Sequence, residues 1–111
     1  MRHEGACHCG AISIVIAFDP EDACECNCSI CRRTGALWTY GAPRNVRING
    51  VGVGYVQGDA TLTLWHCATC GITTHWTALD SGYDRIGINL RLFDPALWSG
   101  LARRHIDGAS W

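Results

Sequence analysis

The sequence predicts a small, mainly β domain built from short antiparallel strands and tied together by bound metal. Apolar and polar residues alternate with a period of two along most of the chain. Glycine, asparagine and aspartate interrupt this pattern at short intervals, and helix signals are few. The 111 residues fit one domain, residues 1–111, whose modest core would gain from cross-links. Eight cysteines could provide them by binding zinc.

The strands are expected at regular intervals from residue 12 onward. In residues 12–18, ISIVIAF, one face carries the apolar side chains Ile12, Ile14, Ile16 and Phe18. Residues 19–22, DPED, form a turn. Six further segments rich in threonine and aromatic residues read as strands: 36–41, 46–50, 53–58, 61–67, 72–79 and 85–93.

Two segments carry helix signals. Asp94 can cap a helix whose first position is Pro95, which predicts a short C-terminal helical turn through Leu101. Residues 29–35, SICRRTG, predict a single turn that ends at Gly35.

Charge and hydropathy exclude several classes of partner. The formal net charge of -1 argues against a nucleic-acid surface, and the apolar run at residues 12–18 is far too short to span a membrane. The N-terminus lacks the layout of a secretory signal. We therefore expect a cytoplasmic protein, in which clustered thiols stay reduced and bind metal rather than form disulfides.

The cysteines fall into three groups, two of which end in glycine. Cys7-x-Cys9-Gly10 and Cys67-x-x-Cys70-Gly71 each place two thiols at a sharp turn. Together they supply four thiolates, the complement of a closed structural zinc site. This site would pin the N-terminal strand to the middle of the sheet.

The third group is CECNCSIC, residues 24–31, followed by Arg32 and Arg33. If residues 24–28 are extended, the cysteines at 24, 26 and 28 share a face, and Cys31 follows across a turn. Four ligands here would close the site, whereas three would leave the open position of a catalytic zinc. The spacing of these four cysteines permits either a four-ligand or a three-ligand site. The two arginines could bind an anionic substrate or balance the thiolate charge.

The motifs GACHCGAISI, CNCSICRRTGAL, WHCATCG and DRIGINLRLFD resemble the glutathione-dependent formaldehyde-activating enzyme family, which includes centromere protein V. The resemblance implies a mainly β, tent-like fold with two zinc ions. It implies a structural site at Cys7, Cys9, Cys67 and Cys70, and a catalytic site at Cys26, Cys28 and Cys31. In this chain Cys24 is an additional thiol beside the second site, and a buried strand cysteine is its expected role.

The resemblance implies a carbon–sulfur lyase of the S-(hydroxymethyl)glutathione synthase type, whose partner is a small thiol or thiol–aldehyde adduct. Two other functions fit the sequence: a non-catalytic zinc-stabilised binding module, and a redox or metal sensor that uses Cys24. Beside the named enzyme of that family the sequence is short, and we expect it to lack the segments that could complete a glutathione pocket there. His8, His66 and His75 lie near the cysteine motifs, but a surface or hydrogen-bonded role is expected for each.

Overall fold

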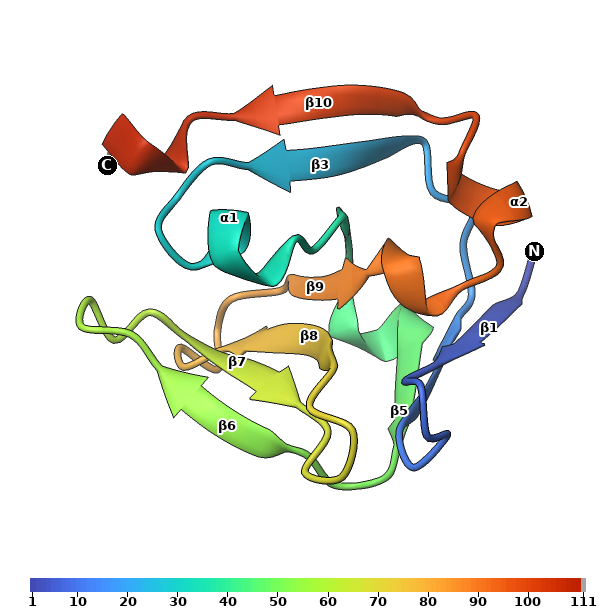
Figure 1. Ribbon diagram of the computed structural model, residues 1–111, viewed down its shortest axis with the longest axis horizontal. Helices are drawn as coiled ribbons and strands as arrows, with labels where there is room; N and C mark the ends of the chain where they lie inside the picture. Colours follow the sequence, from blue (N-terminus) through green and yellow to red (C-terminus); the bar gives the residue numbers. More distant parts are fainter. Residues whose placement is uncertain (111) are drawn as a thin grey trace.

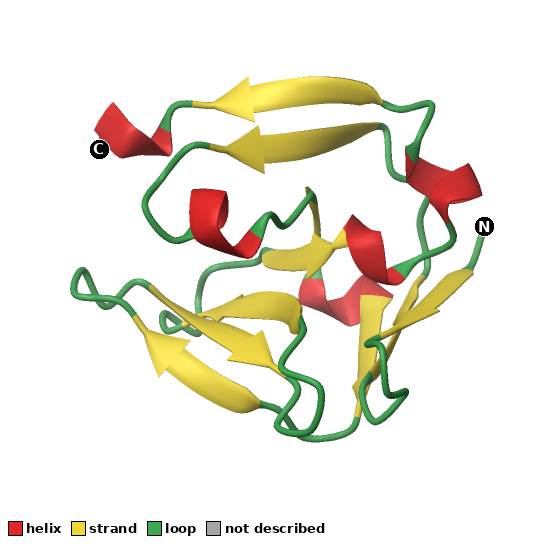
Figure 2. Cartoon of the chain, in the orientation of Figure 1, coloured by secondary structure: helices red, strands yellow, loops and turns green. Residues whose placement is uncertain are grey.

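A computed structural model describes residues 1–110 as strands joined by short helices and loops (Figures 1 and 2). The strands are β1 (His3–Ala6), β2 (Ser13–Ile16), β3 (Asp22–Cys26), β4 (Trp38–Gly41), β5 (Val46–Asn49), β6 (Val53–Val56), β7 (Leu62–His66), β8 (Thr73–Ala78), β9 (Ile86–Asn89) and β10 (Ala102–Ile106). The α-helices are α1 (Cys31–Thr34) and α2 (Pro95–Trp98), and the 3₁₀-helices are η1 (Pro43–Asn45), η2 (Leu90–Leu92) and η3 (Gly108–Ser110). The mainly β prediction is confirmed.

The strands form two sheets. The smaller has the order β1-β2-β5 and the larger the order β10-β3-β4-β9-β8-β7-β6. Within residues 1–110 every strand pairing is antiparallel, as predicted, except that of β3 with β10, which is parallel. The long connection between these two strands makes this parallel pairing possible. It sets Ile106 beside Cys26 and brings the C-terminal segment to the third cysteine group.

The main core lies where the two sheets meet. Ile12, Ile14 and Ile16 are at most 1% exposed, which confirms the alternation predicted for this strand. The buried residues of the central cluster are Ile14, Ile16, Ala23, Leu37, Ile86, Ile88, Leu90 and Phe93. Because this cluster draws on both sheets, it holds them together without contribution from the cysteines.

Both predicted helical turns are present. Gly35 ends α1 with a φ of 68°, a left-handed conformation that favours glycine. The Asp94 carboxylate caps α2 by accepting a hydrogen bond from the Ala96 amide, with Pro95 in the first position. This helix ends at Trp98 rather than Leu101. After Trp98 the chain forms a turn, in which the Leu101 amide donates to the Trp98 carbonyl, and β10 then begins.

Strands β1 and β10 were not predicted. β1 is short and contains Gly5, where a Cβ would lie 2.8 Å from the Leu92 carbonyl oxygen. β10 carries Arg103, Arg104 and His105, so it lacks the alternation on which the other predictions rest. A local sequence pattern cannot predict its pairing with β3, because the two strands lie far apart in the sequence. No helix within residues 1–110 is long and apolar enough to cross a membrane.

Candidate metal centres

The first cysteine group joins two turns that are far apart in the sequence. Cys7 and Cys9 follow β1, whereas Cys67 and Cys70 lie between β7 and β8. The four Sγ atoms all lie within 4.8 Å of one another. The structure therefore brings together the four residues that the sequence assigned to one site.

The two turns share one backbone design. The amide of Cys7 donates to the Ile12 carbonyl, and the amide of Cys67 donates to the Ile72 carbonyl. Gly10 and Gly71 close the turns with φ values of 82° and 78°, and their amides donate to the carbonyls of Cys7 and Cys67. Only glycine adopts this conformation without strain, which explains why each cysteine pair is followed by one.

The geometry and chemistry of this group fit zinc. The Sγ atom of Cys9 lies 3.7 Å from that of Cys7 and 3.5 Å from that of Cys67. A disulfide needs about 2.05 Å. Sulfurs bound tetrahedrally to zinc at about 2.3 Å lie about 3.8 Å apart, close to the observed spacing. Four thiolates without another ligand type form the donor set of a closed structural zinc site.

Backbone amides contact the sulfurs of this group and lower the pKa of two of its four thiols. The Ile12 amide donates to Cys7 Sγ at 3.3 Å, and the Thr69 amide donates to Cys67 Sγ at 3.4 Å. Hydrogen bonds from the amides of Cys9 and Ile72 lower the pKa of Cys70 to about 6. Those from Cys70 and Thr69 lower the pKa of Cys67. Cys9 differs: the Ala11 amide acts to lower its pKa, but hydrogen bonds with the neighbouring sulfurs and burial raise it to about 11. The backbone thus favours the thiolate form at Cys67 and Cys70 before a metal binds.

The second group lies at the end of β3. Cys26 is the last residue of the strand, Cys28 lies in the loop that follows, and Cys31 begins α1. The Sγ atoms of these three residues lie within 4.8 Å of one another and are half-buried. The structure thus brings together the three residues to which the resemblance assigned the second zinc.

Cys24 does not belong to this group of three. Its side chain is fully buried, and its thiol faces the Asp22 carboxylate, with Sγ 3.9 Å from Oδ1. It packs in an apolar cluster with Ala36 and Trp38. Burial raises the pKa of the Cys24 thiol and so favours its neutral form. The sequence spacing also allowed a closed site of four ligands that includes Cys24. The buried position of the Cys24 thiol does not fit that alternative.

The three thiols of the second group have unequal environments. Burial raises the pKa of Cys31 to about 12. Burial also acts to raise the pKa of Cys28, but hydrogen bonds, led by that from the Cys31 amide, lower it below the ordinary value. That amide lies 3.4 Å from Cys28 Sγ. Cys28 is therefore more readily ionised than Cys31, whose sulfur needs a nearby cation to become a thiolate.

Aromatic side chains extend from the second group toward the surface. Trp38 is buried against Cys24, and the half-buried Tyr40 and Trp76 pack on the same cluster as Cys31. The Tyr40 and Trp76 rings lie 6.0 Å apart, and Trp76 stacks on Tyr83 with centroids 6.5 Å apart. These residues form an apolar wall beside Cys31, on one side of the second sulfur group.

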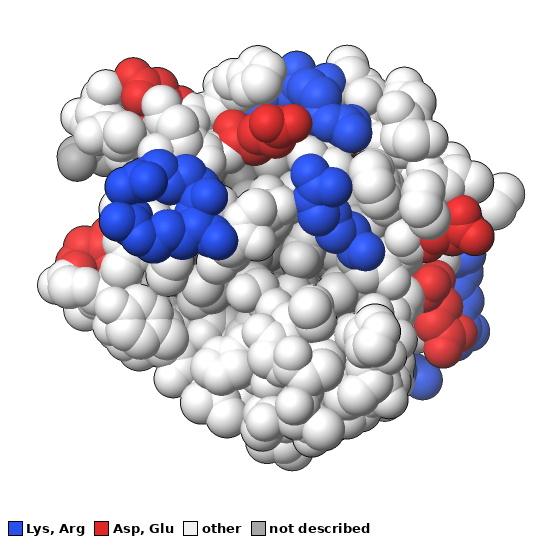
Figure 3. Space-filling model, viewed as in Figure 1, with Lys and Arg blue, Asp and Glu red and all other residues white. Residues whose placement is uncertain are grey.

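Arg32 and Arg33 are exposed in the last turn of α1, directly after Cys31. Figure 3 shows this basic patch over α1, on a face that is hollowed toward its middle and almost free of charge over β6 and β7. The Arg33 guanidinium donates to the Ser29 carbonyl at 2.7 Å. Arg32 forms no side-chain hydrogen bond or ion pair with residues 1–110 and is the freer cation.

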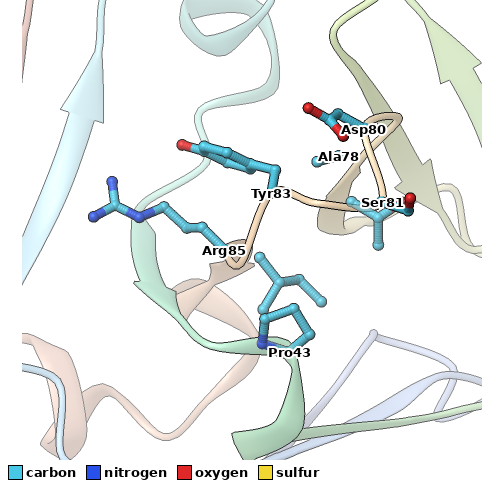
Figure 4. Close-up of a pocket in the computed structure, with 8 residues that line it drawn as sticks. Pro43, Ala78, Asp80, Ser81, Tyr83 and Arg85 are labelled. Atoms are coloured by element: carbon cyan, nitrogen blue, oxygen red, sulfur yellow. The ribbon is translucent and has the colours of Figure 1, made fainter.

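A cavity of about 210 Å³ lies at the loop between β8 and β9, and sequence reasoning did not assign its residues a role. Figure 4 shows Tyr83 and Arg85 extending to one side of it, away from Asp80 and Ser81. The Arg85 guanidinium lies 5.5 Å from the centre of the Tyr40 ring. Arg85 thus adds a positive charge at the outer end of the aromatic wall. Arg85 begins a predicted strand and lies in the DRIGINLRLFD motif, but neither signal assigned it a role in the site.

No histidine within residues 1–110 joins either sulfur group. His8 is exposed and His66 half-buried. His75 is 6% exposed, stacks on Trp65, and has Nδ1 2.8 Å from the Thr74 hydroxyl. Burial lowers the pKa of His75 to about 4. It is a neutral core histidine, in line with the hydrogen-bonded role expected for it.

The fold and the two sulfur groups define a class of protein: a small β domain with one group of four thiols and one of three, each of which could hold a metal ion. The sequence model of the glutathione-dependent formaldehyde-activating enzyme family matches residues 2–103. The chain therefore belongs to this family.

A solved structure gives the same picture of the fold. A crystal structure of a Rhodobacter sphaeroides protein is similar to this chain with a TM-score of 0.74 and 32% sequence identity. The similarity covers 90% of this chain and 97% of that protein. No curated protein sequence matches the chain.

Proposed function

We propose that the protein is a zinc-dependent enzyme of carbon–sulfur chemistry that acts on an adduct between an aldehyde and a small thiol of the glutathione kind. One zinc would be held by Cys7, Cys9, Cys67 and Cys70, and a second by Cys26, Cys28 and Cys31. The reaction class is that of a lyase which forms or breaks the bond between the thiol sulfur and the aldehyde carbon. In the forming direction the thiol proton ends on the aldehyde oxygen.

The observation that carries this proposal is the exclusion of Cys24 from the second sulfur group. Three half-buried thiols meet at the end of β3, while the fourth nearby thiol is turned into the core toward Asp22. A three-thiolate zinc leaves one position for an outside ligand. Zinc bound there would favour the deprotonated form of a substrate thiol and fix its orientation.

The chain's own residues would bind and shield the substrate. The wall of Trp38, Tyr40 and Trp76 excludes water from one side of the three sulfurs. Arg32 and Arg33 are placed to attract the carboxylates of a glutathione-like thiol, and Arg85 adds a charge at the far end of the wall. Cys24, kept neutral by burial, leaves the fourth position free.

The proposal is tested by NMR exchange between free ¹³C-formaldehyde and its glutathione adduct. Catalytic amounts of the zinc-loaded protein are expected to raise the exchange rate above the spontaneous rate. Cys28→Ser is expected to return the rate to the spontaneous value, because it removes one of the three ligands of the second centre. Cys24→Ser is the matched control and is expected to keep the rate of the wild-type protein.

A non-catalytic binding module makes a different prediction. Both metals would then be structural, and the wild-type protein would leave the exchange rate at its spontaneous value with every thiol tried. Cobalt substitution distinguishes an enzyme with an open second centre from a binding module with two structural metals. Millimolar glutathione is expected to change the absorption of a cobalt ion at the second centre and to leave that of the first centre unchanged.

A further inference from the structure

We propose that the C-terminal segment Asp107–Ser110 is a positioning element of the second metal centre, joined to it by Asn27. This inference rests on the proposed function, since it concerns the same three sulfurs. Residues 104–110 lie beyond the stretch that the family model matches. The segment reaches the centre because β10 runs parallel to β3, which places Ile106 beside Cys26.

Asn27 lies between the ligands Cys26 and Cys28 and uses three polar groups to hold the C-terminal segment. Its backbone amide donates to the Ile106 carbonyl at 3.1 Å. Its side-chain Nδ2 donates to Asp107 Oδ1 at 2.9 Å, and its Oδ1 accepts from the Ala109 amide at 2.9 Å. An amide side chain suits this place because it presents a donor and an acceptor together.

The C-terminal segment is itself held in one shape. The Ser110 hydroxyl donates to Asp107 Oδ2 at 2.6 Å, and the Ser110 amide donates to the Asp107 carbonyl at 3.3 Å. Asp107 therefore receives a hydrogen bond on each carboxylate oxygen, one from Asn27 and one from Ser110. This network turns the chain back so that Gly108 is buried against the cysteines.

Gly108 makes the closest approach to the sulfurs. A Cβ at this position would lie 2.6 Å from Cys26 Sγ and 3.1 Å from Cys28 Cβ. Real Cβ atoms essentially never come so close to a neighbouring atom, so any larger residue must displace Cys26 or the segment. The glycine backbone thus forms one side of the centre and limits where the Cys26 sulfur can lie.

The rest of the loop shows why this support is needed. Cys28 and Cys31 are fixed relative to each other by α1, since Arg32 donates its amide to the Cys28 carbonyl and Cys31 donates to Cys28 Sγ. Cys26 is fixed by β3. Asn27 lies in the loop that connects β3 to α1. Within residues 1–110, the hydrogen-bond partners of its side chain come from the C-terminal segment.

The test is a chelator competition on the full, zinc-loaded chain that resolves zinc release from each centre. Asn27→Asp places two carboxylates against each other, and Gly108→Ala crowds Cys26 Sγ. Each is expected to weaken zinc binding at the second centre by about tenfold to a hundredfold, the usual effect of a lost supporting contact. Zinc at the four-cysteine centre and the thermal midpoint of unfolding are expected to change little.

A double variant distinguishes this contact from a general disturbance. Asn27→Asp combined with Asp107→Asn reverses donor and acceptor and is expected to restore zinc affinity to within about threefold of wild type. Asn45→Asp is the matched control, since Asn45 is exposed and its side chain has no partner within residues 1–110. It is expected to bind zinc as the wild type does.

Three results would overturn the inference while the proposed function stands. They are unchanged zinc affinity in Asn27→Asp, a double variant no better than the single one, and equal zinc loss from both centres. If the wild-type chain binds zinc at one centre only, the proposed function fails and this inference fails with it. If two zinc ions bind but formaldehyde exchange is not accelerated, the lyase proposal fails and the positioning role is tested as before.

Discussion

The two cysteine groups are alike in chemistry but opposite in how they connect the chain. Cys9 and Cys67 are 58 residues apart and belong to turns beside different sheets. Cys26, Cys28 and Cys31 lie within one short stretch of the chain. A bond that closes a long loop removes more conformational entropy from the unfolded chain than one that closes a short loop. The first group is therefore suited to stabilise the fold and the second is not.

The surroundings of the sulfurs also differ, although each group holds thiols with lowered and with raised pKa. In the four-cysteine group two matched turns close with glycines, the pKa of Cys67 and Cys70 is lowered, and that of Cys9 is raised. In the three-cysteine group the pKa of Cys28 is lowered and that of Cys31 raised, and one side of the site is an aromatic wall. A structural site is complete within the chain, whereas a site for an outside thiol must leave one ligand position to it.

The largest effect is expected from breaking the four-cysteine group. Cys67→Ser removes one of four ligands from the site that joins the two distant turns. We expect loss of the first zinc and a fall in the free energy of unfolding of more than about 5 kcal/mol, because structural zinc contributes directly to folding. Circular dichroism and zinc content are the measurements. A folded variant with an unchanged melting temperature would contradict the structural role.

Breaking the three-cysteine group is expected to cost much less stability. Cys28→Ser should release one zinc of two and abolish thiol-dependent activity, yet lower the free energy of unfolding by less than about 3 kcal/mol, because a short loop gains little from closure. The thermal midpoints of Cys28→Ser and Cys67→Ser, measured side by side, give the comparison. Equal losses of stability in the two variants would remove the distinction between the centres.

Acid is expected to weaken the fold through His75 independently of either metal. Its pKa is about 4 in the folded protein, against an ordinary value of 6.5. Between these values the unfolded chain binds more protons, so stability is complete above about pH 6.5 and falls as the pH drops toward 4. The loss is on the order of 3 kcal/mol at most.

The matched measurement is denaturant unfolding of wild type and His75→Gln at several pH values from 7 to 4. Subtracting the variant's curve removes the contribution of metal loss, which both proteins share. The difference in the free energy of unfolding between wild type and His75→Gln should shrink steadily as the pH falls from 7 to 4. A difference that stays constant would show that His75 is not responsible.

Replacing the buried extra thiol sharpens the distinction between an open and a closed centre. Cys24→Ala is expected to leave two zinc ions bound and to cost about 1–2 kcal/mol, since it removes one buried sulfur from the cluster around Trp38. Zinc content by elemental analysis and the unfolding midpoint test this. Loss of the second zinc would place Cys24 among its ligands.

The smallest effect is expected at the basic patch. Arg32→Gln should weaken glutathione binding about threefold to tenfold at low salt and change neither zinc content nor stability, because an exposed cation contributes through a screened interaction. Titration of the cobalt-substituted protein with glutathione measures it. The difference from wild type should disappear at high salt, and a difference that persists would indicate a contact other than charge.

The sequence predicted the parts of this molecule that depend on neighbouring residues. The alternation in residues 12–18, the Asp94 cap and the Gly35 stop are local patterns, and the structure has all three. The two glycine-ended motifs were paired across the chain because together they supply four thiolates, the number that a closed zinc site needs. The group of Cys26, Cys28 and Cys31 was implied by the family resemblance and not by its spacing.

Features that depend on distant pairing could not be predicted in this way. β10 has no alternating pattern, and its parallel pairing with β3 is set by the fold. The bond between Asn27 and Asp107 spans 80 residues. Asn27 lies within the CNCSIC motif, but nothing in that motif points to Asp107. The spacing of CECNCSIC left the role of Cys24 open, because only packing against Trp38 turns that thiol into the core.

The most direct test of the account is the number of sulfurs around zinc, measured by X-ray absorption on the chain loaded with two zinc ions. With four cysteines at one centre and three at the other, the average is expected to be about 3.5 sulfurs per zinc, rising to about 4 when glutathione is added. An average of about 4 without added thiol, unchanged by glutathione, would mean that both centres are closed and would contradict the account.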